Sequence, residues 1–224
     1  MHPIIARKGF PIIGIIFCSV LVLFLLSCIA HGHLASAFRI GSLAGALFLF
    51  FSLYFFRDPE RNIPHNRKVL LSPADGTIID IREMSEPLYL KTSARRVSIF
   101  MSVFNVHVNR SPVNGTIEYM HYNPGKFISA FKDKASDENE SMLVGIQRTA
   151  GSEKIAVKFI AGLIARRIVF YNKLKDKVGQ GERINMIRFG SRVDIFCPLN
   201  AEIKVKNGDK VTAGITVIAA LREQ

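Results

Sequence analysis

A glycine–serine peptide bond stands near the C-terminal end of the chain, between Gly190 and Ser191 in the stretch MIRFGSRVDIF. A serine hydroxyl can attack the carbonyl carbon of the preceding residue and convert the amide into an ester. Glycine has no side chain to block this attack and tolerates the strained backbone that it needs. If the ester then eliminates, the serine becomes a dehydroalanine and finally a pyruvoyl group, an electrophile made from the chain itself. A Gly-Ser pair is also common in ordinary turns.

The chain offers few bases that could remove the hydroxyl proton of such a serine. Histidine is the usual base near neutral pH, and beyond residue 56 the histidines are His65, His107 and His121. In the stretch FNVHVNRSP, strand alternation places Asn105, His107 and Asn109 on one polar face. That face indicates either a lined pocket or an exposed strand edge, and His107 is the candidate base.

A carboxylate that orients the histidine would complete a relay of the kind that serine hydrolases use. Asp75 is the candidate, because in SPADG it stands at a turn that follows an apolar strand. The same residue could instead only form the turn through its own side-chain hydrogen bonds. The pattern alone leaves both interpretations of Asp75 open.

Two apolar runs near the N-terminus indicate where this chemistry takes place. Residues 11–30 are apolar almost throughout, residues 40–56 form a second run, and the first 56 residues contain no acid. About 20 helical residues cross a hydrocarbon core. The sequence therefore predicts a membrane hairpin over residues 1–56, with a shallow interfacial anchor as the alternative. Basic residues flank both ends of the hairpin, which predicts that the following domain lies on the cytoplasmic side of the inner membrane.

The elements after the hairpin are predicted to be strands. Residues 57–68 are charged, contain two prolines and are typical of a linker. Over residues 69–224, short β-branched runs alternate with turn residues, which favours a mainly β domain. The tail AEIKVKNGDKVTAGITVIAAL has the strand–turn–strand order that closes lipoyl- and biotinyl-type sandwiches, and SPADGTI has a similar form. The predicted fold is a β-rich barrel-sandwich, without the Met-Lys pair that a swinging-arm carrier requires.

The composition of the whole chain limits the classes of partner that it is expected to bind. The formal net charge is +12, which suits nucleic acid or anionic lipid. No aromatic-interleaved basic strand or recognition-helix pattern supports nucleic acid, so anionic membrane lipid is the predicted partner. The three cysteines, Cys18, Cys28 and Cys197, show neither a disulfide framework nor metal-ligand spacing, and no metal site is predicted.

Four motifs together carry a resemblance to a known family. SPADGTI, FMSVFNVHVNRSPVNG, GLIARRIV and MIRFGSRVD occur in this order along the chain. In these motifs and their spacing the chain resembles the phosphatidylserine decarboxylases, and most closely their short, prokaryotic, membrane-associated branch. The resemblance extends from residue 56 to residue 221, and the hairpin fits the branch as well.

The resemblance implies a self-processing enzyme. The precursor would cut itself between Gly190 and Ser191 into a β chain of residues 1–190 and an α chain of residues 191–224. Ser191 would become the pyruvoyl cofactor, whose ketone forms a Schiff base with the amine of phosphatidylserine. Release of CO2 and hydrolysis then give phosphatidylethanolamine. The conjugated imine supplies the electron sink that an amino acid lacks, with no metal and no pyridoxal phosphate.

The same resemblance assigns roles to single residues, with one departure. Asp75, His107 and Ser191 match the family's self-cleavage relay. Longer members carry two histidines three residues apart, whereas here His107 takes the first position and Arg110 the second. Asn105 also stands where an aspartate is common. Arginine keeps its proton and cannot serve as a base, so a two-histidine scheme does not transfer to this chain.

The headgroup phosphate of such a substrate requires cationic or amide donors. Guanidinium groups match phosphate oxygens well, so Arg110, Arg166 and Arg167 are candidate ligands, with Asn109 beside Arg110. The alternation of a strand could instead expose one arginine of the adjacent pair to solvent.

Two alternatives to this function remain open. An ether-lipid analogue of phosphatidylserine would react on the same residues. A non-enzymatic membrane adaptor with a lipoyl-like sandwich would explain the hairpin, SPADGTI and the tail, but it would leave FNVHVNR and RFGSR without a purpose. The oligomeric state, a homo-oligomer included, is also open.

Overall fold

The computed structural model of the chain describes residues 4–126, 135–162, 168–187 and 190–221. The chain divides into two compact units, residues 1–60 and residues 61–224. The boundary between the units falls within the segment 57–68 that the sequence indicates as a linker.

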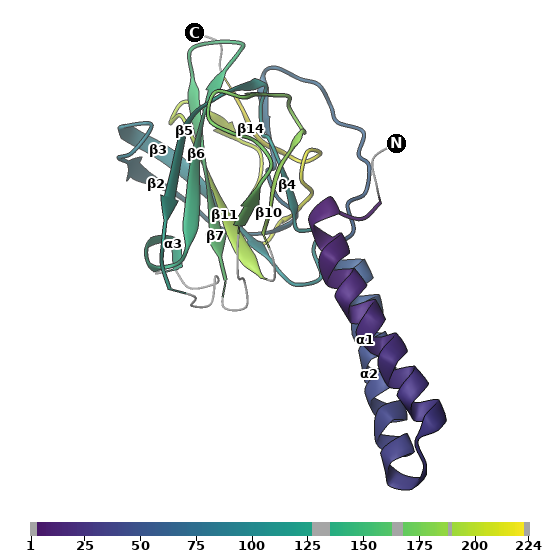
Figure 1. Cartoon of the computed structure of the whole chain (residues 1–224). Coiled ribbons are helices and arrows are strands. Elements are labelled where there is room, and N and C mark those ends of the chain that lie inside the picture. The colour runs from purple at the N-terminus through teal and green to yellow at the C-terminus, as the bar shows by residue number, and fades with distance from the viewer. Residues whose placement is uncertain (1–3, 127–134, 163–167, 188–189, 222–224) are drawn as a thin grey trace. The chain divides into compact units, whose positions relative to one another are not determined.

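The first unit is a helical hairpin (Figure 1). A short 3-10 turn, Arg7–Gly9, leads into α1 (Phe10–Ile29), and α2 (Gly32–Phe55) returns alongside it. The helices pack closely, since a Cβ atom at Gly45 would lie 2.8 Å from Cγ2 of Val20. Both helices are long and apolar enough to cross a membrane. α2 begins ahead of the predicted apolar run and includes Arg39.

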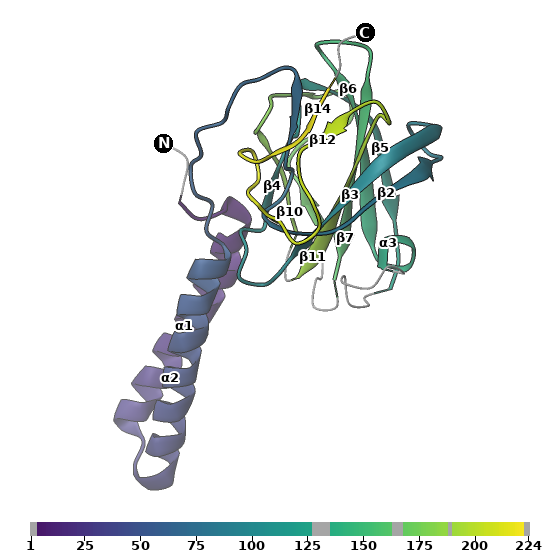
Figure 2. The ribbon, with the colours of Figure 1, turned by 180° about the vertical axis from the view of Figure 1, so that it is seen from behind.

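The second unit is built around one large antiparallel sheet that curls on itself (Figures 1 and 2). Its eight strands follow the order β13-β2-β3-β11-β7-β6-β5-β9. Their bounds are β2 (Gly76–Glu86), β3 (Thr92–Met101), β5 (Gly115–Asn123), β6 (Ser141–Arg148), β7 (Lys154–Ala161), β9 (Lys177–Val178), β11 (Ser191–Cys197) and β13 (Lys210–Val211).

Two small sheets accompany the large one. The first has the order β4-β10-β8, and the second has the order β1-β14-β12. Their bounds are β4 (Val108–Arg110), β8 (Ile168–Phe170), β10 (Arg183–Ile187), β1 (Val69–Leu71), β12 (Glu202–Ile203) and β14 (Val217–Ala220). A single helical turn, α3 (Ala135–Glu138), lies between β5 and β6 in the chain.

The two similar elements noted in the sequence pair with each other. SPADGTI lies between β1 and the start of β2, while the tail forms β12, β13 and β14. In the structure β1 pairs with β14, and β2 pairs with β13. The predicted mainly β fold with an N-terminal helical hairpin is therefore confirmed, and its two ends close on one another as a sandwich does.

Strand β11 lies in the middle of the large sheet, between β3 and β7. All seven of its residues are buried. Val193, Ile195 and Cys197 pack into the main hydrophobic core, so the alternate residues Arg192 and Asp194 lie on the opposite face. Burial on both faces gives β11 a fixed register, because a shift by one residue would exchange the two faces.

Candidate active site

Ser191 is the first residue of β11 and is wholly buried. Its backbone is in register with Met101 on β3 and with Ala161 on β7. The hydroxyl lies 3.2 Å from the sulfur of Met101, to which it donates. A thioether is a weak acceptor, so this contact holds the serine in a dry site without committing its oxygen to a strong partner.

Gly190 precedes Ser191 with a φ of +56°. This is the left-handed region, which costs a residue with a side chain roughly 1–2 kcal/mol. Among the described residues nothing lies within 4 Å of a Cβ atom built on Gly190. Backbone conformation, rather than lack of space, is therefore the physical reason for glycine at this position.

His107 lies just before β4 and is also wholly buried. A tight turn positions it: the side-chain oxygen of Asn105 accepts hydrogen bonds of 2.9 Å from both the amide and the hydroxyl of Ser102. The carbonyl oxygen of Asn105 lies 2.9 Å from Nδ1 of His107. A carbonyl only accepts, so Nδ1 carries a proton, and Nε2 is the nitrogen that holds the lone pair when the ring is neutral.

The face of the small sheet that carries His107 turns toward the face that carries Ser191. The amide of Ile187, on β10, donates to the carbonyl of His107 at 3.2 Å, which extends the β4–β10 ladder back to the histidine. Ile187 belongs to the same hydrophobic core as Ala161 and Val193. Both figures show β4 and β10 beside β11 (Figures 1 and 2). The backbone of the predicted base is thus bonded to Ile187, whose side chain packs into the same core as the strands on either side of Ser191.

Asp75 lies in the turn between β1 and β2, and its carboxylate has partners of its own. Arg61 donates to its two oxygens at 2.6 and 2.8 Å, and the amide of Ala213 donates at 2.8 Å. Among the described residues these are its recorded hydrogen bonds, and none joins it to His107. The turn does approach β4, because the amide of Arg110 donates to the carbonyl of Pro73 at 2.8 Å.

The candidate phosphate ligands differ in their surroundings. Arg110 is buried, and its guanidinium donates to the carbonyl of Gly181 at 2.9 Å. Asn109 is wholly buried beside it and donates to the side chain of Asn185 at 2.6 Å. Arg166 and Arg167 lie outside the described residues.

A buried charge cluster lies on the face of β11 opposite Ser191. Arg192 and Asp194 are both wholly buried and form an ion pair, with 2.7 Å between Nε and Oδ1. Arg192 also donates to the hydroxyl of Ser98 at 2.9 Å, and the hydroxyl of Ser136 donates to Asp194 at 2.9 Å. Charge-assisted hydrogen bonds of this kind hold geometry tightly.

The cluster continues toward the surface through β2 and β3. A guanidinium nitrogen of Arg96 lies 4.0 Å from Asp194, and another donates to Asp80 at 2.8 Å. Arg82 donates to the same carboxylate at 2.6 Å. Burial by itself would raise the pKa of Asp80, but the hydrogen bonds and charges of Arg82 and Arg96 outweigh it and lower the pKa below its ordinary 3.8.

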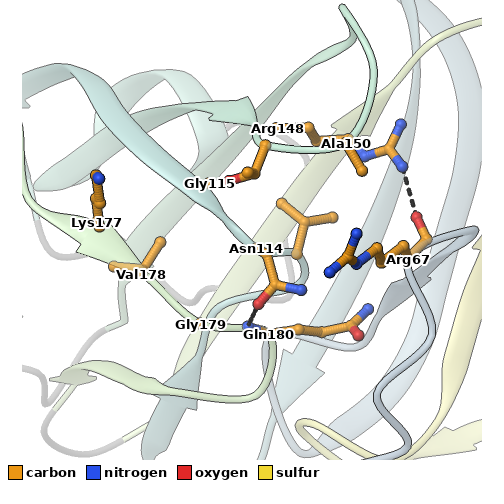
Figure 3. Close-up of a pocket in the computed structure, with 11 residues that line it drawn as sticks. Arg67, Asn114, Gly115, Arg148, Ala150, Lys177, Val178, Gly179 and Gln180 are labelled. Carbon is orange, nitrogen blue, oxygen red and sulfur yellow. Dashed lines mark hydrogen bonds between the residues drawn. The ribbon is translucent and has the colours of Figure 1, made fainter.

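A hollow in the surface is lined by a different set of residues (Figure 3). It has a volume of about 400 Å³ and is lined by Arg67, Val113, Asn114, Gly115, Arg148, Thr149, Ala150, Lys177, Val178, Gly179 and Gln180. Arg148 ends β6, whereas the other end of β6 lies near Ser191. The 8 residues of β6 span roughly 26 Å at about 3.3 Å per residue. This pocket is therefore not the site of Ser191.

Other nucleophiles and metal ligands add little to the site. Burial raises the pKa of the Cys197 thiol to about 12, so that it stays protonated near neutral pH and is a poor nucleophile. Within the part of the chain that the structure describes, no group of three His, Cys, Asp or Glu side chains could hold a metal ion.

Motifs and spacing in the sequence did not point to Arg192, Asp194 or Asn185. For the first two, the signal was present in RVDIF, where an arginine and an aspartate two residues apart share one face of an otherwise apolar strand. For Asn185 the signal was a lone amide in the apolar run INMI. In each case a buried polar residue requires a partner, which the structure supplies for both members of the ion pair and only in part for Asn185.

Comparison with known proteins gives a family. The model of the phosphatidylserine decarboxylase family matches residues 48–219. That range contains the turn of Asp75, the stretch of His107 and the Gly190–Ser191 bond.

Individual relatives agree over nearly the whole chain. The phosphatidylserine decarboxylase proenzyme of Ralstonia nicotianae is 44% identical over 98% of this chain and 97% of its own length. The proenzyme of the Wolbachia of Brugia malayi is 47% identical over 92% of this chain and 89% of its own length. That of Neisseria meningitidis serogroup B is 46% identical over 98% of this chain and 78% of its own length.

Proposed function

Because the chain belongs to the phosphatidylserine decarboxylase family, we propose that it converts phosphatidylserine to phosphatidylethanolamine and CO2 after cutting itself between Gly190 and Ser191. Membership of this family makes the chain a carboxy-lyase and decides against the non-enzymatic adaptor. The ether-lipid analogue stays an alternative substrate for the same residues.

The main support for self-cleavage is the backbone conformation at residues 190 and 191. A glycine with a φ of +56° is followed at once by a wholly buried serine, at the end of a strand that is paired on both sides. Glycine adopts this left-handed backbone without strain, so the bond to be cut can be held in this conformation directly before the buried hydroxyl. Burial also keeps out water, which would otherwise hydrolyse the ester to a plain cut.

The atoms balance in a short sequence of steps. Oγ of Ser191 bonds to the carbonyl carbon of Gly190 as the C–N bond breaks, which gives an ester and frees the amine of Ser191. Loss of the α-proton of Ser191 expels Gly190 as a carboxylate and leaves dehydroalanine. Addition of one water and loss of one ammonia then give the pyruvoyl group at the start of chain 191–224.

His107 is proposed as the base for this maturation. Its Nδ1 faces the carbonyl of Asn105, so Nε2 is the ring nitrogen that is proposed to accept the proton. Asp75 is proposed as the third member of the relay. Its carboxylate is held by a bidentate pair with Arg61, so a contact with the histidine would have to add to that pair or replace it.

The charge cluster on the opposite face supports the stability of the cut enzyme. After cleavage the α chain would begin at Ser191, and no covalent bond would hold its first residue in place. Strand β11 would still pair with β3 and β7, and Arg192 would remain bound to Asp194 and Ser98. We infer that these contacts keep the new N-terminus aligned beside His107.

The pyruvoyl group supplies the electron sink for the carbanion that is left when CO2 departs. The proposed contribution of the chain's own side chains is to bind and orient the headgroup. Asn109 and Arg110, close to His107 in the chain, are the proposed ligands among the described residues. Arg166 and Arg167 stay predictions, since they lie outside those residues.

The proposed location is the inner membrane, with residues 61–224 on the cytoplasmic side. Two apolar helices long enough to span a bilayer support membrane association. Arg7 and Lys8 precede the hairpin, while Arg57 and Arg61 follow it, and such flanks favour the cytoplasmic side.

Intact mass spectrometry of the full chain under denaturing conditions tests this function. We expect two polypeptides that divide after Gly190, the smaller one lacking an amine at its N-terminus. The variant Ser191→Ala, which has no hydroxyl to attack Gly190, should stay a single chain and release no CO2 from phosphatidylserine. A cleaved Ser191→Ala chain would overturn the mechanism, and a cleaved native chain without turnover of phosphatidylserine would overturn the substrate.

A further inference from the structure

Two asparagines at the centre of the small sheet form an incomplete hydrogen-bond pair. Asn109 on β4 and Asn185 on β10 are in register, and both are wholly buried. Nδ2 of Asn109 donates to Oδ1 of Asn185 at 2.6 Å. Among the residues that the structure describes, Oδ1 of Asn109 and Nδ2 of Asn185 have no hydrogen-bond partner.

The incomplete pairing does not depend on which amide atom is nitrogen and which is oxygen. If both side chains are turned over, Asn185 donates to Asn109 instead, and the atoms left over again comprise one donor and one acceptor. Buried polar groups without partners are rare, because each has lost its hydrogen bonds to water. The donor and the acceptor left over in this pair therefore have to be satisfied by water or by a ligand.

The pair lies on the face that turns toward Ser191. Asn185 is in register with Phe170 on β8, and residues in register share a face of a sheet. The ring of Phe170 packs edge-on against Phe159 of β7, with 5.5 Å between ring centroids. Phe159 is in register with Val193, which shares its face of β11 with Ser191.

A donor beside an acceptor matches the headgroup of an α-amino acid. Such a headgroup carries an ammonium, which donates, and a carboxylate, which accepts, on the same carbon atom. Neutral amides also suit decarboxylation, in which the carboxylate loses its charge as CO2 forms. A full positive charge against that carboxylate would stabilise the substrate more than the transition state, whereas an amide N–H orients it at a smaller cost.

We propose that Asn185 and Asn109 are the binding residues for the serine headgroup of the lipid substrate. With the amides oriented as in the structure, the amide N–H of Asn185 donates to the carboxylate, and the carbonyl of Asn109 accepts from the amine before it condenses and again after release. This inference deepens the proposed function and rests on it, because scission after Gly190 has to open a site that is closed in the intact chain.

Single alanine variants of the full chain in lipid vesicles test the assignment. Asn185→Ala should raise the KM for phosphatidylserine about 10-fold or more, as expected for a lost hydrogen bond to a charged group. Its inhibition by phosphatidylethanolamine should stay unchanged, because the product has no carboxylate. Asn109→Ala should weaken the binding of both lipids. Asn200→Ala, at an exposed position after β11, is the matched control and should change neither.

A purely structural pair would give a different pattern. Unchanged KM for phosphatidylserine in Asn185→Ala, or equal changes for both lipids, would overturn the assignment. Intact mass spectrometry of the same samples separates this failure from failure of the proposed function. A normally cleaved and active Asn185→Ala enzyme with unchanged KM would contradict only the headgroup site, not the proposed function.

The double variant Asn109→Val/Asn185→Val supplies a further test, whose first readout, the unfolding temperature, does not depend on turnover. If the incomplete pair serves a ligand, replacing both amides by apolar residues should raise the unfolding temperature and abolish the discrimination between the two lipids. A lower unfolding temperature with discrimination intact would mean that ordered water alone completes the pair.

Discussion

Ser191 and Arg192 are neighbours in the chain, yet their side chains lie on opposite faces of β11 and meet different environments. On the first face, the hydroxyl of Ser191 contacts the sulfur of Met101 among apolar neighbours. On the second face, Arg192 is bound to Asp194 and Ser98 by short charge-assisted hydrogen bonds. Both faces are closed to solvent.

The two environments match the different roles that the two faces of β11 have in the proposed reaction. The hydroxyl has to leave its resting contact and attack a neighbouring carbonyl, so a weak partner suits it. The strand has to stay in register when its first peptide bond is cut, so a strong and directional anchor suits its other face. One strand thereby combines a reactive residue with a fixed support.

The largest effect is expected on the reacting face, from His107→Ala. Loss of a general base slows proton transfer by about 10²–10⁴-fold, so maturation, decarboxylation or both should slow by that factor. Denaturing gels after a pulse of synthesis measure the first rate, and release of CO2 from phosphatidylserine measures the second. Normal rates of both maturation and decarboxylation would show that His107 is not part of the site. The two faces of β11 would then not differ in function.

On the supporting face, Arg192→Leu should destabilise the protein by about 3–5 kcal/mol, because it leaves the carboxylate of Asp194 buried without its main partner. Urea unfolding of the uncleaved Ser191→Ala background measures this without interference from processing. The double variant Arg192→Leu/Asp194→Leu is the control and should recover much of the loss, since no unpaired charge remains. Equal losses in the single and double variants would show that the ion pair does not anchor β11.

A smaller effect is expected from Gly190→Ala. The added side chain meets open space among the described residues, but it disfavours the left-handed backbone by roughly 1–2 kcal/mol. We expect a folded protein that cleaves about tenfold more slowly. Intact mass spectrometry over time measures this rate of cleavage. Cleavage at the native rate would show that the φ of Gly190 does not contribute to the reaction.

The smallest effect is expected from acid, at the outer end of the charge cluster. Arg82 and Arg96 hold the pKa of Asp80 below its ordinary 3.8. A lowered pKa in the folded state contributes stability that is fully present above pH 3.8 and is lost as the pH falls through the folded value. Asp80→Asn should therefore flatten the acid side of the curve of unfolding free energy against pH. If the curve of the variant keeps its native slope, carboxylates other than Asp80 cause that slope.

Much of this molecule could be predicted from local pattern. The hairpin follows from the length of two apolar runs, and the mainly β domain follows from short β-branched runs between turns. The similar form of SPADGTI and the tail indicated a sandwich, and the structure shows that the two segments pair with each other. The Gly190–Ser191 bond could be singled out because its chemistry depends on the types of only two adjacent residues.

Other features depended on which surfaces meet in three dimensions. Strand alternation put His107 and Asn109 on one face, but it could not tell that β10 would bring Asn185 to the same face. It also left open whether Asp75 would meet the histidine, and in the structure its carboxylate is bound to Arg61, which precedes it by one strand. The physical reason is that period-2 alternation sorts residues between the two faces of a strand, whereas the order of strands in the sheet decides which faces come together.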